Sequence, residues 1–141
     1  MKSKLHIYTS YVSPMTLDVF VKNNILPIFI IRSIHNSQLI GKYSDTSIHF
    51  KDLAPSGELY RARRDGLIGD LEFNKKYVIE MSEINFQDII KRLDYLASLC
   101  GADSVVLLGY GMDYERCHRK LLAELLNASG LLENNIKEIV L

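Results

Sequence analysis

A cysteine, a histidine and an arginine follow one another at Cys117, His118 and Arg119, in the first turns of a predicted helix. These residue types could generate a thiolate nucleophile, because a helix N-terminus and nearby cations lower the pKa of a thiol. We therefore name Cys117 and His118 as candidate catalytic residues. The alternative is a buried, unreactive cysteine beside a core histidine that bonds a backbone carbonyl or a carboxylate, and we prefer it because free cysteines are usually buried.

The elements that must position this group lie between residues 104 and 126. Residues 104–108 form an apolar run typical of a buried strand, and Gly109 and Gly111 indicate a turn. Asp113 is a suitable N-cap for the helical pattern that follows. Strand, turn and helix in this order are a common location for sites in α/β proteins.

Helical spacing predicts where the three side chains point. At 100° per residue, His118 lies within the buried stripe of the helix, Cys117 lies at the margin of that stripe, and Arg119 points away from it. With Asp113 as the cap, Cys117 is about the fourth helical residue, where the helix dipole acts weakly. The three residues are therefore expected to have separate roles rather than to form one catalytic unit.

Other polar residues fall where predicted strands end, which is where open α/β sheets bind ligands. The glycines after residue 108 could admit an anion to the backbone N–H groups, and the arginines at 61, 63 and 64 could clamp a phosphate or carboxylate. The alternatives are simple turn geometry for the glycines and a solvated face, paired with Glu58 and Asp65, for any single arginine. The candidate ligand-binding residues are Ser10, Tyr11, Arg32, Arg61, Arg64, Gly109, Tyr110 and Arg119.

The remaining pattern predicts alternating strands and helices. Strands are expected at residues 5–11, 26–34, 47–50, 104–108 and 137–141. Helices are expected after caps at Ser13, Ser56, Asn85 and Asp113, with another beginning at Asp70. The side chains expected to be buried include Met15, Leu17, Val19, Phe20, Phe73, Tyr77, Ile79, Met81 and Cys100. These elements predict a single α/β domain over residues 1–141, with a mostly parallel central sheet flanked by helices in a Rossmann-like three-layer arrangement.

Composition excludes several classes of protein. The chain has 141 residues with 17 basic and 17 acidic side chains, and this zero net charge argues against a general nucleic-acid binder. Its 2 cysteines lack the spacing of a structural zinc site, so we predict no metal and no cofactor. No apolar window is long enough to span a membrane and no signal-peptide pattern is visible, so we expect a cytoplasmic protein with free thiols.

Four ordered fragments resemble the family called domain of unknown function 488. They begin at Ile7, Leu53, Gly66 and Leu107, and the last includes the Cys-His-Arg tripeptide. The resemblance implies a compact α/β fold with a parallel sheet, and it implies no established substrate or reaction. The family usually has a Leu-Leu-Cys-x-Glu pattern before the tripeptide, whereas this chain has Gly109 and Gly111 at the Cys and Glu positions.

Two functions follow from these observations. The first is an enzyme-like domain that binds a small anionic or nucleotide-like ligand at the C-terminal edge of the sheet, with thiol chemistry at Cys117. The second is a non-catalytic accessory protein that binds a macromolecule through residues 35–54 and the nearby arginines, because a long segment without periodicity is often functional. The absence of an acidic residue at Gly111 motivates this second function, so whether the chain is an enzyme stays open at this point.

Overall fold

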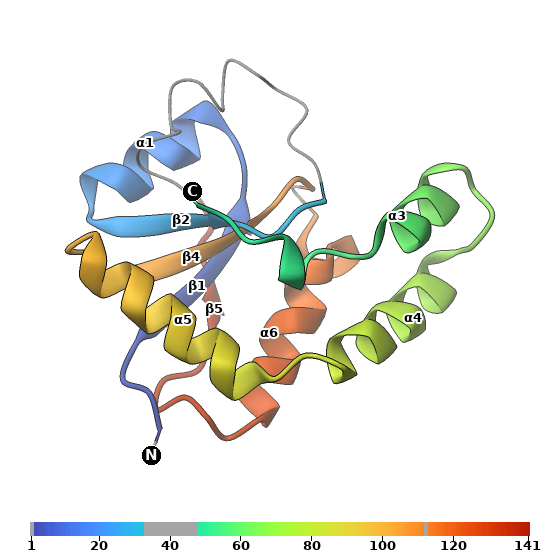
Figure 1. Cartoon of the computed structure of the whole chain (residues 1–141). Helices are drawn as coiled ribbons and strands as arrows, with labels where there is room; N and C mark the ends of the chain where they lie inside the picture. The colour runs from blue at the N-terminus through green and yellow to red at the C-terminus, as the bar shows by residue number, and fades with distance from the viewer. Residues whose placement is uncertain (1, 33–47, 112) are drawn as a thin grey trace.

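The computed structural model describes residues 2–32, 48–111 and 113–141 and contains a parallel sheet in the order β3-β2-β4-β1-β5 (Figure 1). Among the described residues the strands are β1 (His6–Tyr11), β2 (Ile25–Phe29), β3 (Ile48–His49), β4 (Ser104–Gly109) and β5 (Lys137–Glu138). Every strand pairing is parallel, and β4 lies at the centre between β1 and β2. The predicted α/β fold with a mostly parallel sheet is confirmed.

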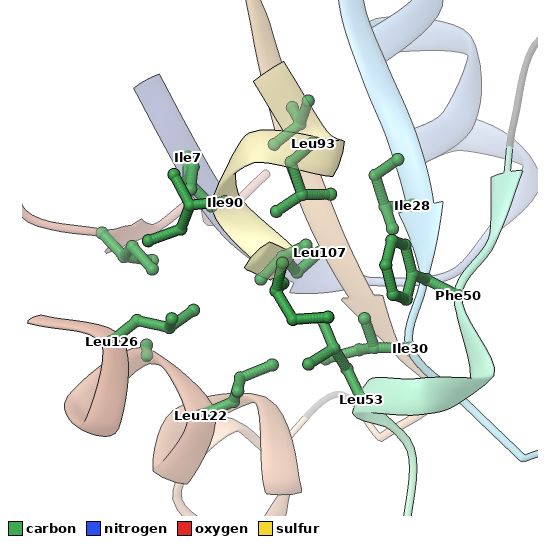
Figure 2. Close-up of a cluster of buried hydrophobic side chains, with 14 of the residues drawn as sticks. Ile7, Ile28, Ile30, Phe50, Leu53, Ile90, Leu93, Leu107, Leu122 and Leu126 are labelled. Carbon is green, nitrogen blue, oxygen red and sulfur yellow. The ribbon is translucent and has the colours of Figure 1, made fainter. Parts of the chain in front are cut away.

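Alternating side chains of the buried strands build a core on each face of the sheet. On one face, Leu17 and Phe20 of α1 (Pro14–Lys22) pack with Val106 and Leu108. The opposite face is covered by α5 (Phe86–Leu99) and α6 (His118–Ala128), and Figure 2 shows the sheet side chains directed toward these helices. Burial of one leucine side chain stabilises the folded state by about 1.5–3 kcal/mol. The central strands bury such side chains on both faces of the sheet, so packing stabilises them from both sides.

The remaining helices form a hairpin beside the sheet. The helix α3 (Gly57–Arg64) is capped by the Ser56 hydroxyl and ends before Gly66, whose φ of 73° a glycine adopts without strain. The helix α4 (Asp70–Ser82) follows, and Figure 1 shows that α3 and α4 extend away from the sheet. Because α4 packs against α6, this hairpin stands next to the C-terminal edge of the central strands.

The parallel register brings the ends of distant segments together. Tyr11 pairs with Gly109, and Phe29 pairs with Leu108, so β1, β2 and β4 all finish at one edge. Beyond β2, the backbone N–H of Ile30 donates to the Leu108 carbonyl at 3.1 Å. The sequence-based expectation that strand ends gather their polar neighbours at one edge is therefore a direct result of the topology.

Several details differ from the predicted pattern. Met15 and Ile79 are 60% and 62% exposed, and Cys100 is exposed at the C-cap of α5 rather than buried. Thr16 takes the buried position in the first turn of α1, because its hydroxyl completes a capping box with Ser13.

The second strand is also shorter than expected. The second strand ends at Phe29 rather than near residue 34. The short strand expected at residues 47–50 is present at Ile48–His49, and a 3-10 turn, η1 (Lys51–Leu53), follows it. Of the segment at residues 35–54, positions 35–47 lie outside the described residues.

Candidate functional site

The helix that carries the site begins later than its sequence pattern predicts. A 3-10 turn, η2 (Tyr114–Arg116), occupies the first positions, and α6 begins at His118 with Cys117 as its N-cap. Asp113 is a cap as expected, but its carboxylate accepts from the Glu115 N–H and so caps η2. Cys117 therefore stands at the N-terminus of α6 and not in its fourth position, at the end of the helix where the dipole acts most strongly.

His118 is held between the thiol and the end of β2. Its Nδ1 lies 4.0 Å from the Cys117 Sγ, and its Nε2 lies 2.5 Å from the Ile30 carbonyl oxygen. Because a carbonyl only accepts hydrogen bonds, Nε2 must carry a proton, which leaves Nδ1 to accept the thiol proton or to pair as an imidazolium with the thiolate. The backbone carbonyl partner expected for His118 is present, and the second nitrogen faces the cysteine. The prediction that His118 lies within the buried stripe of the helix is wrong, because the residue is half-buried and the buried residues of α6 do not include it.

Tyr77 supports the histidine ring from α4. The two rings meet edge to face, with centroids 5.4 Å apart and an interplanar angle of 67°. The Tyr77 hydroxyl donates to the Leu53 carbonyl at 2.7 Å, and burial holds the pKa of Tyr77 well above its ordinary value, so the hydroxyl keeps its proton. Tyr77 was expected to be buried, and its contact with His118 adds a role that sequence periodicity does not reveal.

The surroundings of Cys117 favour a thiolate near neutral pH. Burial raises the pKa of the thiol, but the hydrogen bond and charge of His118, the Arg119 N–H and the Arg119 guanidinium together lower it to about 7. Cys117 is half-buried and lines a pocket. A pKa of about 7 places the titration of this thiol within the physiological pH range.

Arg119 is fully buried, and the prediction that it points away from the buried stripe is wrong. Its side chain has an exposed fraction of 0% and pairs with Glu138 of β5 at 2.9 Å. The buried stripe of α6 consists of Arg119, Leu122, Ala123 and Leu126, at the helical spacing i, i+3, i+4 and i+7. Hydrophobic periodicity assigns an arginine to solvent, and only the tertiary structure supplies the carboxylate that allows its burial.

A pocket of about 530 Å³ opens beside Cys117. Its lining comes from elements that are distant in sequence. The segments after β2 and η1 contribute Ile31, Arg32 and Pro55. The hairpin contributes Tyr60, Arg63, Arg64 and Phe73. The turn after β4 and the approach to α6 contribute Tyr110, Gly111, Asp113, Arg116, Cys117 and His118.

The pocket concentrates positive charge in a chain whose net charge is zero. Its lining contains four arginines and a single aspartate, Asp113. Asp70 bridges Arg63 and Arg116 at 2.9 and 3.2 Å from outside the lining, and these ion pairs are partly exposed. Among the described residues, Arg32 has no carboxylate within ion-pair distance. The arrangement suits an anion, because partly exposed ion pairs exchange partners at little cost.

The predicted site residues separate into two groups. Arg32, Arg64, Tyr110, Cys117 and His118 line the pocket. The others do not line it: Arg61, Ser10, Tyr11, Gly109 and Arg119. Tyr60 and Phe73 line the pocket without having been candidates, although the i, i+4 spacing of Tyr60 and Arg64 on one helix is a usable signal.

Each residue outside the lining has a defined position. Arg61 approaches Gly57, whose added Cβ would lie 3.0 Å from the arginine Nη1. Ser10 is buried and donates to the Ile139 carbonyl at 2.9 Å, while Tyr11 is half-buried at the end of β1. A Cβ added at Gly109 would lie 2.5 Å from the Cys117 Sγ, so this glycine makes room for the sulfur.

Within the described part of the chain, no cluster of three or more His, Cys, Asp or Glu side chains is arranged to hold a metal ion. A search of the same residues finds no helix with the length and apolar character needed to cross a membrane.

Comparison with known proteins gives one match. The family model described as "DUF488-N3a: Active DUF488-N3 subclade" matches residues 30–130, a range that includes the whole pocket lining but not Glu138. No curated protein and no solved structure matches the chain.

Proposed function

The chain belongs to the DUF488 family, and from this premise we propose that it binds a small anionic or nucleotide-like ligand and attacks it with the Cys117 thiolate. The observation that carries the proposal is that Cys117 and four arginines line the same pocket. A cationic pocket collects an anionic substrate, and a thiolate in its lining supplies the nucleophile. The word "active" in the description of the matching subclade model agrees with an enzyme.

The proposed chemistry uses two residues of this chain. The thiol proton passes to His118 Nδ1, and the Cys117 Sγ forms a bond to an electrophilic atom of the bound anion. The bond to the leaving group breaks, its electron pair stays with the leaving group, and the His118 imidazolium returns the proton there. Water then hydrolyses the thio-linked intermediate and restores the thiol. The Ile30 carbonyl keeps His118 in the tautomer that this sequence requires.

The arginines hold the ligand while the sulfur reacts. Guanidinium groups bind phosphate and carboxylate oxygens in pairs, which fixes orientation as well as charge. Arg32 is the first choice for such a contact, because no carboxylate of the described residues pairs with it. Gly109 and Gly111 replace the Cys and Glu that the family often has, and the proposal uses neither of those residues.

The proposal also places the protein in the cytoplasm. A reactive thiol persists in a compartment where glutathione and thioredoxin keep cysteines reduced. Neither Cys100 nor Cys117 forms a disulfide.

The first experiment measures the thiolate directly. A Cys100→Ser protein leaves Cys117 as the remaining thiol of a chain with 2 cysteines, and its alkylation by iodoacetamide is followed between pH 5 and 10. We expect the rate to rise with a midpoint near pH 7, matching the lowered pKa of Cys117. The Cys100→Ser/Cys117→Ser double variant controls for modification elsewhere.

The second experiment looks for the ligand. Melting temperatures are recorded with a panel of phosphorylated and carboxylated metabolites for the wild type and for Arg32→Ala and Cys117→Ser. A ligand of this pocket should raise the melting temperature of the wild type, and most of that increase should be absent in Arg32→Ala. Alkylation that requires denaturant, together with ligand shifts that both variants retain, would instead favour a non-catalytic accessory protein that binds a macromolecule through residues 35–54 and the nearby arginines.

A further inference from the structure

The pocket is larger than a simple anion requires. Its volume of about 530 Å³ falls in the range of pockets that enclose organic ligands, which is roughly 300–1,000 Å³. A phosphate or sulfate ion held by the arginines would leave most of this space to water. The remaining volume therefore calls for an organic portion of the ligand.

Aromatic rings line that volume from separate elements. Tyr60 and Phe73 come from the α3–α4 hairpin, and Tyr110 follows β4. Tyr110 is 37% exposed, so part of its ring is accessible from solvent. Accessible π-faces from separate elements are suited to stacking against a planar ring.

The arginines extend these flat surfaces. The Arg63 guanidinium lies 4.2 Å from the centroid of Phe73, and that of Arg64 lies 5.9 Å from the centroid of Tyr60. A guanidinium stacked on a ring can stack again on its outer face, and the partly exposed pairs of Arg63 with Asp70 and of Arg64 with Asp65 can exchange for a ligand anion at little cost. The hairpin wall thus combines stacking surface and positive charge.

We propose that the ligand of this pocket is a nucleoside monophosphate, with its base against the Tyr60 and Tyr110 rings and its phosphate held by the arginines. This inference rests on the proposed function, because it specifies the organic part of the anion that the pocket binds. Methyl or sugar phosphates satisfy the charge but leave the aromatic surfaces unused. A neutral aromatic compound uses the rings but makes no ionic contact with the arginines.

A matched set of ligands tests the base directly. Isothermal titration of the whole protein compares AMP, GMP, CMP and UMP with ribose 5-phosphate, which has the same phosphate and sugar but lacks a base. Since stacking of one base on aromatic side chains changes affinity by about tenfold or more, at least one nucleotide should bind about tenfold tighter than ribose 5-phosphate. Equal affinities for all five compounds, or no nucleotide binding, would overturn the inference.

Ring variants connect the effect to the pocket. In Tyr110→Leu the advantage of the nucleotide over ribose 5-phosphate should shrink severalfold while ribose 5-phosphate binds as before, and Tyr110→Phe should keep the advantage. Tyr95→Leu, at an exposed tyrosine of α5 that does not line the pocket, is the matched control. If Tyr110→Leu does not fold, Tyr60→Leu takes its place. A nucleotide advantage that survives removal of either ring would overturn the placement of the base.

Two further measurements separate the possible failures. In one outcome, ribose 5-phosphate binds as tightly as the nucleotides and loses its binding in Arg32→Ala. That result would support the proposed anion site and overturn only the inference that the pocket binds a base. Free nucleotides and the 5′ end of a nucleic acid share this chemistry, and a 5′-phosphorylated dinucleotide distinguishes the two sources. Binding as tight as that of the mononucleotide identifies a nucleic-acid end, and much weaker binding identifies a free nucleotide.

Discussion

Arg119 and Glu138 form a two-bonded ion pair that ties the first turn of α6 to the last strand. The Arg119 Nε and Nη2 donate to the two Glu138 carboxylate oxygens at 3.1 and 2.9 Å, and Thr9 donates to the same carboxylate at 2.7 Å. Arg119 also donates through Nη1 to the Gly111 carbonyl. Burial lowers the pKa of Arg119, but Glu138 and the nearby Cys117 raise it by more, so the guanidinium stays charged. The Arg119 side chain therefore connects Gly111, just after β4, to β5.

Removing the carboxylate should destabilise the protein. In Glu138→Ala a guanidinium with 0% exposure loses its counter-ion, and the free energy of unfolding should fall by about 2–4 kcal/mol. Urea denaturation followed by circular dichroism measures the change. Glu133→Ala, at an exposed position near the same end of the chain, should stay within about 0.5 kcal/mol of the wild type. Equal effects of the two substitutions would contradict a structural role for the pair.

Gly109 and Cys117 should be energetically coupled. In Gly109→Ala the new Cβ would approach the Cys117 Sγ to 2.5 Å, and we expect a loss of about 1–3 kcal/mol in the free energy of unfolding. In the Gly109→Ala/Cys117→Ala double variant the sulfur is gone, so the combined loss should be smaller than the sum of the single losses. Gly111→Ala is the control, because a Cβ there has nothing within 4 Å. Strict additivity of the two substitutions would argue against the close packing of this pair.

His118 should control the acidity of the thiol. Its hydrogen bond and its charge are the largest of the contributions that lower the pKa of Cys117 to about 7. In a Cys100→Ser background, His118→Gln should move the midpoint of the alkylation profile upward by about 1 pH unit or more, toward the ordinary thiol value. Lys120→Gln, two residues after His118 and paired with Glu115, serves as the control. An unchanged midpoint in His118→Gln would assign the acidity to the helix N-terminus and Arg119 alone.

The lowered thiol pKa should also appear as a dependence of stability on pH. Cys117 has a pKa of about 7 in the folded chain, below the roughly 8.5 of an unperturbed thiol. Between these pH values the unfolded chain binds more protons than the folded chain. The stabilisation of the folded state by the Cys117 thiolate is therefore fully present above about pH 8.5 and is lost as the pH falls through 7.

The stability of the Cys100→Ser protein minus that of Cys100→Ser/Cys117→Ser should therefore increase by about 1–2 kcal/mol from pH 6.5 to pH 9. Urea midpoints at a series of pH values measure this difference, and the shared background cancels the titrating groups that do not interact with Cys117. A difference that is flat or falls with rising pH would show that the thiol is not acidic in the folded protein.

The sequence by itself determines the architecture, because hydrophobic periodicity reports directly which residues leave water. The apolar runs near Ile28 and Val106 predict strands that are covered on both faces, and the caps at Ser13, Ser56 and Asn85 locate three helix starts. It also identifies Cys117, His118, Arg32 and Arg64 as neighbours of one sheet edge, because parallel strands end together.

Only the tertiary structure decides what these residues do. The carboxylate that lets Arg119 be buried is 19 positions away in β5, and the carbonyl that orients His118 is 88 positions away at Ile30. The cap at Asp113 serves a separate 3-10 turn, so Cys117 moves to the start of α6. Local spacing cannot encode these facts, because charge compensation and hydrogen bonding depend on partners that only the folded chain brings within reach.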